Sequence, residues 1–165
     1  MKRTLTLMFL AMVFLLPPVA AQQYSNQLKK ELIDLPGWKG ADADGADMIF
    51  NQMKLITASR EYTKGDAQVT VGILITNTGT QAGKIPTVLY EDEDGFAKTQ
   101  KIKGYDAYVV YDKKEHNGSI IVILLNDPIA MLVTLNYEKI GWQEAVDLMK
   151  KFDLDAMKKV AESLK

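Results

Sequence analysis

The sequence contains no cysteine and a single histidine, and these two absences exclude much of the usual chemistry of small proteins. Without a thiol there is no disulfide, no thiolate metal site, no cysteine nucleophile and no acylated lipoprotein cysteine. The only histidine, His116, falls in a predicted turn beside two lysines and a glutamate, where a general base would have no oriented partner. We therefore expect neither catalysis nor metal binding by His116, and no cofactor.

Long apolar runs are also scarce. The run near the start, Leu5–Leu16, has about a dozen residues, fewer than the roughly 20 that a membrane-spanning helix requires. The run has the flanks of a signal peptide. Lys2 and Arg3 precede it, Pro17-Pro18 end it, and the small residues Val19-Ala20-Ala21 stand where a signal peptidase cleaves. We expect a signal peptide over residues 1–21, a mature chain from Gln22, and a periplasmic or secreted protein without stable membrane insertion.

Neither sign of charge dominates the chain, which has 20 basic and 21 acidic residues. The leader takes two of those basic residues, which leaves 18 against 21 acids, and no basic stripe could follow a phosphate backbone. We expect no nucleic-acid partner. Of 165 residues, removal of the first 21 leaves 144, the size of one ordinary domain over residues 22–165. Export without cysteine is more typical of a bacterial envelope protein than of a small eukaryotic secreted domain.

Hydrophobic periodicity predicts a helix followed by a group of strands. Ser25 is the expected N-cap of a helix that ends before Pro36. Strict apolar alternation within Gln68–Thr76 predicts a half-buried strand in a hairpin with Ser59–Thr63. The apolar run Ile120–Leu125 predicts a central strand covered on both faces. Further strands are expected at Ala97–Lys103, Tyr105–Tyr111 and Ile129–Tyr137.

The connections and the C-terminal region complete the predicted fold. Asn117-Gly118 predicts a tight hairpin turn, whereas residues 77–95 carry no clear signal. Apolar stripes predict one helix over residues 142–149 and a second capped by Asp153 or Asp155. Because the turns are short and the strands are grouped between helices, we predict a single α+β domain. Its antiparallel sheet has five or six strands, flanked by an N-terminal helix and one or two C-terminal helices.

Two Asp-rich segments offer oxygen ligands of the kind that calcium prefers, from Asp42, Asp44, Asp47, Asp92 and Asp94. Their spacing departs from the helix–loop–helix calcium motif. Aligning Gly45 with the glycine of that motif puts Gly40 at the first ligand position and Asn51 at the last. The second segment likewise places Tyr90 first and Lys101 last. Each segment is therefore either a non-standard calcium site or a solvated turn.

Motifs for nucleotide binding and serine catalysis are missing. Gly79–Lys84 has three residues between its glycines and is followed by Ile85, so it departs from a phosphate loop. No serine lies in a G-x-S-x-G sequence. Paired carboxylates could still hydrolyse glycosidic bonds without histidine or cysteine. A small carboxylate-based hydrolase of envelope sugars or peptides is therefore the alternative enzyme class.

Four aromatic residues are the candidates for binding a ligand or partner: Tyr105, Tyr108, Tyr111 and Trp38. The tyrosines share one predicted strand, where alternation places Tyr108 on the face opposite the other two. Aromatic rings with a polar tip suit both half-buried sheet faces and interfaces. The tyrosines therefore either pack beneath a helix or form an exposed patch. Trp38 either pins its loop to the sheet or lines a groove.

Several segments together resemble small exported bacterial α+β proteins of no settled function: Leu35-Pro36-Gly37-Trp38, Ser59–Gly65, Lys103-Gly104-Tyr105, Val110-Tyr111-Asp112 and Phe152–Met157. At the level of architecture, a helix-flanked antiparallel sheet is also similar to the Mog1/PsbP-like group. That likeness implies a binding or assembly-assisting role. We therefore expect a non-enzymatic domain of the bacterial envelope that binds an envelope protein or a small molecule, with a structural homo-oligomeric subunit as a further alternative.

Overall fold

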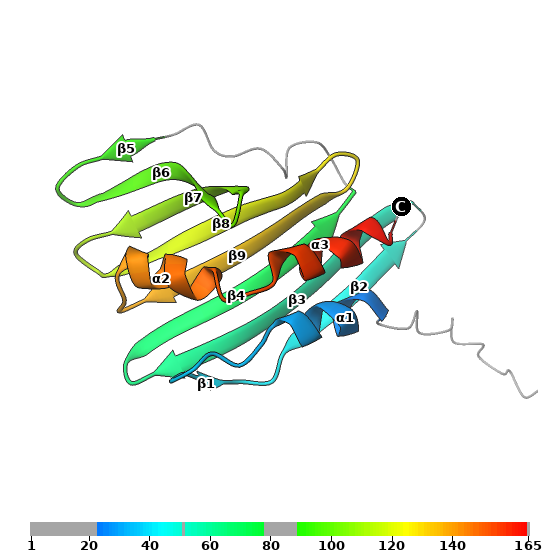
Figure 1. Ribbon diagram of the computed structural model, residues 1–165, viewed down its shortest axis with the longest axis horizontal. Helices are drawn as coiled ribbons and strands as arrows, with labels where there is room; N and C mark the ends of the chain where they lie inside the picture. The colour runs from blue at the N-terminus through cyan, green and yellow to red at the C-terminus, as the bar shows by residue number, and fades with distance from the viewer. Residues whose placement is uncertain (1–22, 51, 78–88, 165) are drawn as a thin grey trace, which may run out of the picture.

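The computed structural model describes residues 23–50, 52–77 and 89–164 (Figure 1). The predicted signal peptide over residues 1–21 and the segment Gly79–Lys84 lie outside the described residues. In chain order the elements are α1 (Gln23–Glu31), β1 (Lys39–Gly40), β2 (Asp44–Phe50), β3 (Met53–Lys64), β4 (Ala67–Thr76), β5 (Tyr90–Glu91), β6 (Gly95–Ile102), β7 (Tyr105–Asp112), β8 (Asn117–Asn126), β9 (Ala130–Glu138), α2 (Trp142–Met149) and α3 (Leu154–Glu162).

This order confirms the predicted α+β class, with one helix before the strands and two after them. The described strands form a single sheet in the order β1-β3-β4-β9-β8-β7-β6-β5, and β2 also pairs with β3. Every pairing among them is antiparallel. The described sheet has nine strands rather than five or six, because the seven-residue strand β2 and the two-residue strands β1 and β5 were not predicted.

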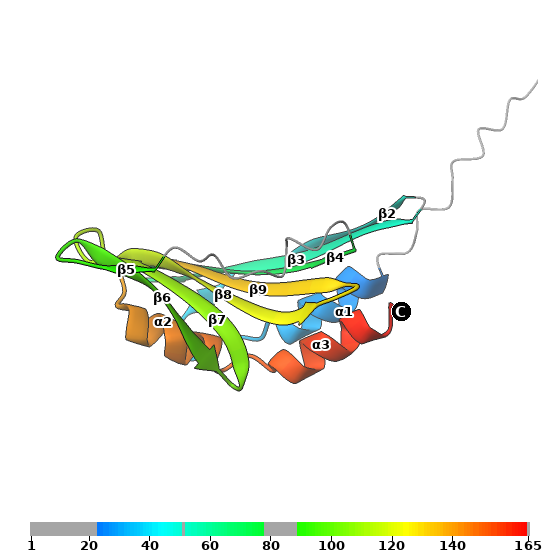
Figure 2. The ribbon, with the colours of Figure 1, turned by 90° about the horizontal axis from the view of Figure 1, so that it is seen from above.

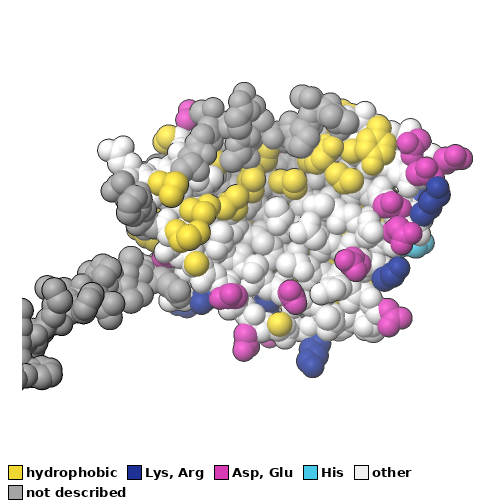
Figure 3. All heavy atoms as spheres, turned by 180° about the vertical axis from the view of Figure 1, so that it is seen from behind, with side chains coloured by type: hydrophobic (Ala, Val, Ile, Leu, Met, Phe, Trp, Pro, Cys, Tyr) yellow, Lys and Arg dark blue, Asp and Glu magenta, His cyan; other side chains and the backbone are white. Residues whose placement is uncertain are grey.

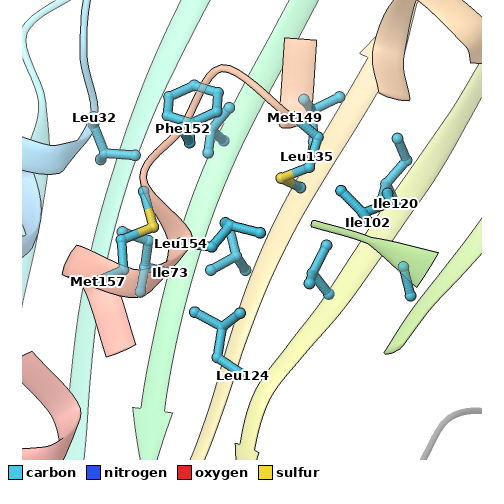
Figure 4. Packing of buried hydrophobic residues seen from close by; sticks show 14 of the residues in the cluster. Leu32, Ile73, Ile102, Ile120, Leu124, Leu135, Met149, Phe152, Leu154 and Met157 are labelled. Carbon is cyan, nitrogen blue, oxygen red and sulfur yellow. The ribbon is translucent and has the colours of Figure 1, made fainter. Parts of the chain in front are cut away.

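The three described helices lie on one face of the sheet, as the view from above shows (Figure 2). We call this the inner face and the opposite one the outer face. Alternate residues of each strand point to the inner face, which is why Ile73 of β4, Ile120 of β8 and Leu135 of β9 are buried there. Leu32, after α1, and Met157 of α3 pack over the same core (Figure 4).

The start of α1 is held by a side chain from the sheet rather than by its own sequence. The Asp47 carboxylate in β2 accepts hydrogen bonds from the Tyr24 and Ser25 backbone N–H groups, at 2.9 and 2.7 Å. Such bonds satisfy N–H groups that the first turn of a helix leaves free. The prediction of Ser25 as N-cap is wrong, since Ser25 lies inside the helix and is buried.

At the other end of the chain, Asp153 caps α3. Its side chain accepts a hydrogen bond from the Ala156 N–H at 2.9 Å, which decides between the two acids considered from the sequence. The apolar stripe of α3, including Met157 and Val160, then faces the sheet. Within the described residues, no helix is long and apolar enough to span a membrane.

The turn between β7 and β8 differs from the prediction. Asn117 and Gly118 belong to β8, and residues 113–116 make the turn. The Asp112 carboxylate organises it by accepting hydrogen bonds from the Lys114 and Glu115 N–H groups, at 2.8 and 2.9 Å. A longer, Asp-capped turn therefore replaces the two-residue turn that the Asn-Gly pair predicted.

The apolar run of β8 is central in the sheet, between β7 and β9, but its two faces are covered unequally. Ile120, Val122 and Leu124 are buried under the helices. Ile121 and Ile123 point to the outer face and stay half-buried. The prediction of a central strand is confirmed, whereas helices of the described chain cover only one of its two faces.

Candidate functional site

The three tyrosines of β7 are divided between the two faces of the sheet. Tyr111 belongs to the buried core and Tyr105 packs against it, both on the inner face. Tyr108 pairs with Ile121 and points the other way. Tyr108 and Tyr111 are each only 7% exposed, so neither ring offers an open surface. The tyrosines therefore do not form one patch.

Tyr111 is the centre of an aromatic cluster beneath α2. Its ring stacks on Tyr137 at 6.3 Å between centroids and lies 5.8 Å from Phe96. Phe96 in turn meets Trp142 edge to face at 5.4 Å. Contacts of this kind stabilise beyond their buried area. The aromatic residues at this end of the sheet therefore serve to pack the core.

His116 is exposed in the turn after β7, and its Nδ1 atom lies 2.8 Å from the Tyr111 hydroxyl oxygen. No carboxylate is hydrogen-bonded to the described His116 ring, so the arrangement lacks the orienting acid of a catalytic histidine. The imidazole instead anchors the turn to the aromatic cluster.

Trp38 is half-buried and packs against the core, at the beginning of β1. The Lys64 ammonium nitrogen lies 5.6 Å from the centroid of its ring, within reach of a cation–π interaction. Lys64 also lies 3.5 Å from a Glu144 carboxylate oxygen of α2. Trp38 thus joins the loop after α1 to the sheet.

The first Asp-rich segment is partly a strand. Both carboxylate oxygens of Asp47 are engaged at the start of α1, and an Asp44 oxygen accepts the Gly45 N–H at 2.8 Å. Asp42 is exposed, just before β2. The sequence did not predict β2, because Asp, Gly and Ala are weak strand formers and only the pairing with β3 fixes them.

The second Asp-rich segment is the turn between β5 and β6. An Asp92 oxygen accepts the Asp94 and Gly95 N–H groups, both at 2.9 Å, and Asp94 pairs with Lys114 at 2.5 Å. Nowhere in the described ranges do three or more histidine or acidic residues converge as metal ligands would. Asp44 and Asp92 lie near opposite edges of the sheet, so these two acids form no catalytic pair.

Three tyrosines have raised pKa values, for structural reasons. Burial raises the pKa of Tyr62 to about 12, and its hydroxyl donates to the Ile33 carbonyl at 2.9 Å. The hydrogen bond to the Asp155 carboxylate raises the pKa of Tyr105 to about 12. Burial raises the pKa of Tyr137, which donates to the Val110 carbonyl at 3.0 Å. All three phenols act as hydrogen-bond donors that join elements, rather than as bases.

The outer face is the remaining candidate surface. It is formed by alternate residues of β3 (Leu55–Glu61), β4 (Gln68–Leu74), β9 (Leu132–Glu138) and β8 (Asn117–Ile123). No helix of the described chain covers it (Figure 2). In the space-filling view, hydrophobic side chains form a band on this side of the molecule, and both acidic and basic side chains lie toward the edges of the view (Figure 3).

Two larger hollows lie on the outer face, and a smaller one of about 130 Å³ lies at its β1 edge between Lys39, Glu61 and Thr63. The first, of about 330 Å³, is centred on Gly72 and is bordered by Thr57, Ser59, Leu74 and Thr134. We call it the Gly72 hollow. The second, of about 420 Å³, is the polar hollow, lined by the side chains of Gln68, Thr70, Asn117, Ser119, Asn136 and Glu138.

Sequence reasoning missed this surface although the signal was present. The alternation that buries Val69, Val71 and Ile73 necessarily places Gln68, Thr70 and Gly72 on the opposite face. What the sequence did not reveal is that no described helix covers that face, and that β9 and β8 extend it.

The fold and this surface together define an α+β domain with one sheet face covered by helices and one that no described helix covers. No family model matches the sequence, and no curated protein is significantly similar to it. Among solved structures, an uncharacterised protein from Mycobacterium smegmatis is similar with a TM-score of 0.40 and 12% identity, over 86% of this chain and 98% of that chain. A likeness at this level supports no statement about function.

Proposed function

We propose that this protein is an exported, non-enzymatic binding domain of the bacterial envelope, and that the outer face of its sheet holds the partner. The observation that carries this proposal is the outer face, which no described helix covers, with its two larger hollows. Large surfaces that combine apolar and polar groups in this way are typical of interaction sites. Export is inferred from the leader-like residues 1–21.

The absence of assembled chemistry in the described residues favours binding over catalysis. His116 is engaged by Tyr111. Among the acidic candidates, Asp47 holds a helix start, Asp92 caps a turn and Asp94 pairs with Lys114. The tyrosines with raised pKa values donate to carbonyl or carboxylate oxygens of neighbouring elements. Nothing in this arrangement combines a nucleophile, a base and a cleft.

The proposal is tested with the full chain expressed in an exporting bacterial host. A photo-crosslinking residue replaces Ser59, which is exposed at the rim of the Gly72 hollow, or Lys159, which is exposed on α3. We expect a mature mass that begins at Gln22 and an adduct at least tenfold stronger from position 59 than from position 159. A chain retained in the cytoplasm contradicts export, and equal or absent labelling from position 59 contradicts the outer face as the binding surface.

A further inference from the structure

The two larger hollows of the outer face lie along the same strand but differ in chemistry. In β4, Gly72 lies two residues from Thr70 and four from Gln68, so the two hollows are separated by roughly 7–13 Å at about 3.3 Å per residue. This separation is short enough for one segment of a partner to occupy both.

The Gly72 hollow is shaped for an apolar side chain. Leu74 pairs with Leu132, and Leu132 pairs with Ile123, so three aliphatic side chains form a row beside it. All three are half-buried, and they leave apolar surface at its edge. Gly72 contributes no side chain, and the space above it is what an inserted apolar group would fill. Enclosed apolar anchors of this kind carry most of the energy of protein interfaces.

The polar hollow is lined by one acidic side chain and no basic one, whereas Lys39 and Glu61 together line the smaller hollow at the β1 edge. Its side chains are amides and hydroxyls, together with the Glu138 carboxylate. Glu61 lies on the same face, and its neighbour Thr70 lines the hollow. None of the ion pairs in the described chain includes Glu61 or Glu138. The defined positions of β3, β4, β9 and β8 include no lysine or arginine. On the same face beyond them lie Lys39 of β1 and Lys101 of β6, and Lys101 is paired with Asp106. This charge distribution favours a cationic group on the partner.

From this juxtaposition we propose that the outer face docks a protein segment that places an apolar side chain in the Gly72 hollow and a lysine or arginine side chain in the polar hollow. The inference rests on the proposed function and specifies the partner. A second copy of this chain that packed its polar hollow against that of the first would bring their Glu138 side chains together, and like charges brought together in this way oppose that arrangement.

The experiment uses the full chain with the photo-crosslinking residue at position 59 in the exporting host, and adds three sets of substitutions. Gly72→Leu fills the first hollow. A Cβ at position 72 would meet only the Thr134 Oγ1 atom, at 2.9 Å, which can rotate away. Leu132→Ser changes the apolar row without filling the hollow. Glu61→Gln with Glu138→Gln removes the acidic charge, and Glu31→Gln with Glu162→Gln is the matched control away from the outer face.

We expect Gly72→Leu, Leu132→Ser and the Glu61/Glu138 pair each to reduce the adduct at least tenfold, whereas the Glu31/Glu162 pair leaves it unchanged. Raised salt should weaken the adduct of the parent chain, and its crosslinked partner peptide should contain lysine or arginine next to an apolar residue. Melting temperatures show that each variant is folded.

Other outcomes overturn the inference in distinguishable ways. An adduct with the mass of two copies of this chain identifies self-association. An adduct at position 59 that resists both the Gly72→Leu and the Glu61/Glu138 substitutions leaves the proposed function standing but refutes the partner chemistry. An adduct at position 159 and none at position 59 refutes both.

Discussion

Gly118 lies opposite Tyr137 in the pairing of β8 with β9, where a side chain would prevent the strands from closing over the aromatic cluster. A Cβ at this position would lie well inside van der Waals contact with the Val110 carbonyl oxygen and 2.5 Å from the Tyr137 hydroxyl oxygen. The same hydroxyl donates to Val110 at 3.0 Å. Glycine is required here by close approach rather than by a turn.

We therefore expect Gly118→Ala to reduce the free energy of unfolding by about 3 kcal/mol, from overpacking and the loss of the Tyr137 hydrogen bond. Urea unfolding measures this loss. Gly72→Ala is the matched control, also a strand glycine. Its Cβ meets a single rotatable hydroxyl, so it should cost less than about 1 kcal/mol. Equal stability of the two variants would show that the close approach at Gly118 is unimportant.

Tyr105 gives a residue-scale prediction for alkaline pH. Its hydrogen bond to Asp155 raises its pKa to about 12 from the ordinary value of about 10. The stability contributed by the neutral phenol is fully present below the ordinary pKa and is lost as pH rises through the folded-state pKa. Tyr105→Phe should therefore have a lower free energy of unfolding than the wild type at neutral pH. This difference between the two proteins should disappear progressively between pH 10 and pH 12.

Absorbance at 295 nm detects the ionised phenol directly. The folded wild type should show a tyrosine that titrates near pH 12 and is missing from Tyr105→Phe. Tyr62, whose pKa is also raised to about 12, remains in both proteins, so the measurement is the difference between them. In concentrated urea, where both proteins are unfolded, the difference between their titration curves should be centred at about pH 10. A difference already centred near pH 10 in the folded proteins would contradict the Tyr105–Asp155 bond.

At the scale of elements, the structure attaches its helices through side chains that come from elsewhere in the chain. Arg60 of β3 donates to the Leu32 and Ala41 carbonyl oxygens, at 2.7 and 2.8 Å, and pairs with Asp34 at 2.5 Å. The side chain is only 16% exposed. Asp47 of β2 likewise holds the first turn of α1. Helix α1 is therefore positioned by the sheet edge on which it lies.

Asp47→Ala should lower the free energy of unfolding by about 1–2 kcal/mol, because two backbone N–H groups lose their acceptor. Asp47→Asn keeps one carbonyl acceptor and should cost about half as much. Hydrogen exchange of residues 23–31 detects local fraying of α1, and urea unfolding detects a loss of stability of the whole domain. Unchanged exchange in Asp47→Ala would contradict the role of Asp47 at this helix start.

At the scale of the whole molecule, strands distant in sequence meet in the middle of the sheet. β4 pairs with β9 from Gln68↔Glu138 to Thr76↔Ala130, which joins the first hairpin to the later strands. The three helices then cover one face of the joined sheet, around a single buried core. The outer face is a product of this assembly, because β3, β4, β9 and β8 each supply only part of it.

The sequence by itself determined the α+β class, the two faces of β4 and the helices at each end, because these follow from periodicity and local signals. It narrowed the cap of α3 to Asp153 or Asp155, and the structure decided for Asp153. It did not determine β2, the Asp47 contact with α1 or the role of Gly118, since each depends on pairing between distant segments. Only the tertiary structure decided which sheet face the described helices cover, and so which side chains are left as a surface. Alternation specifies two faces for every strand, but the choice between them requires the packing of the whole domain.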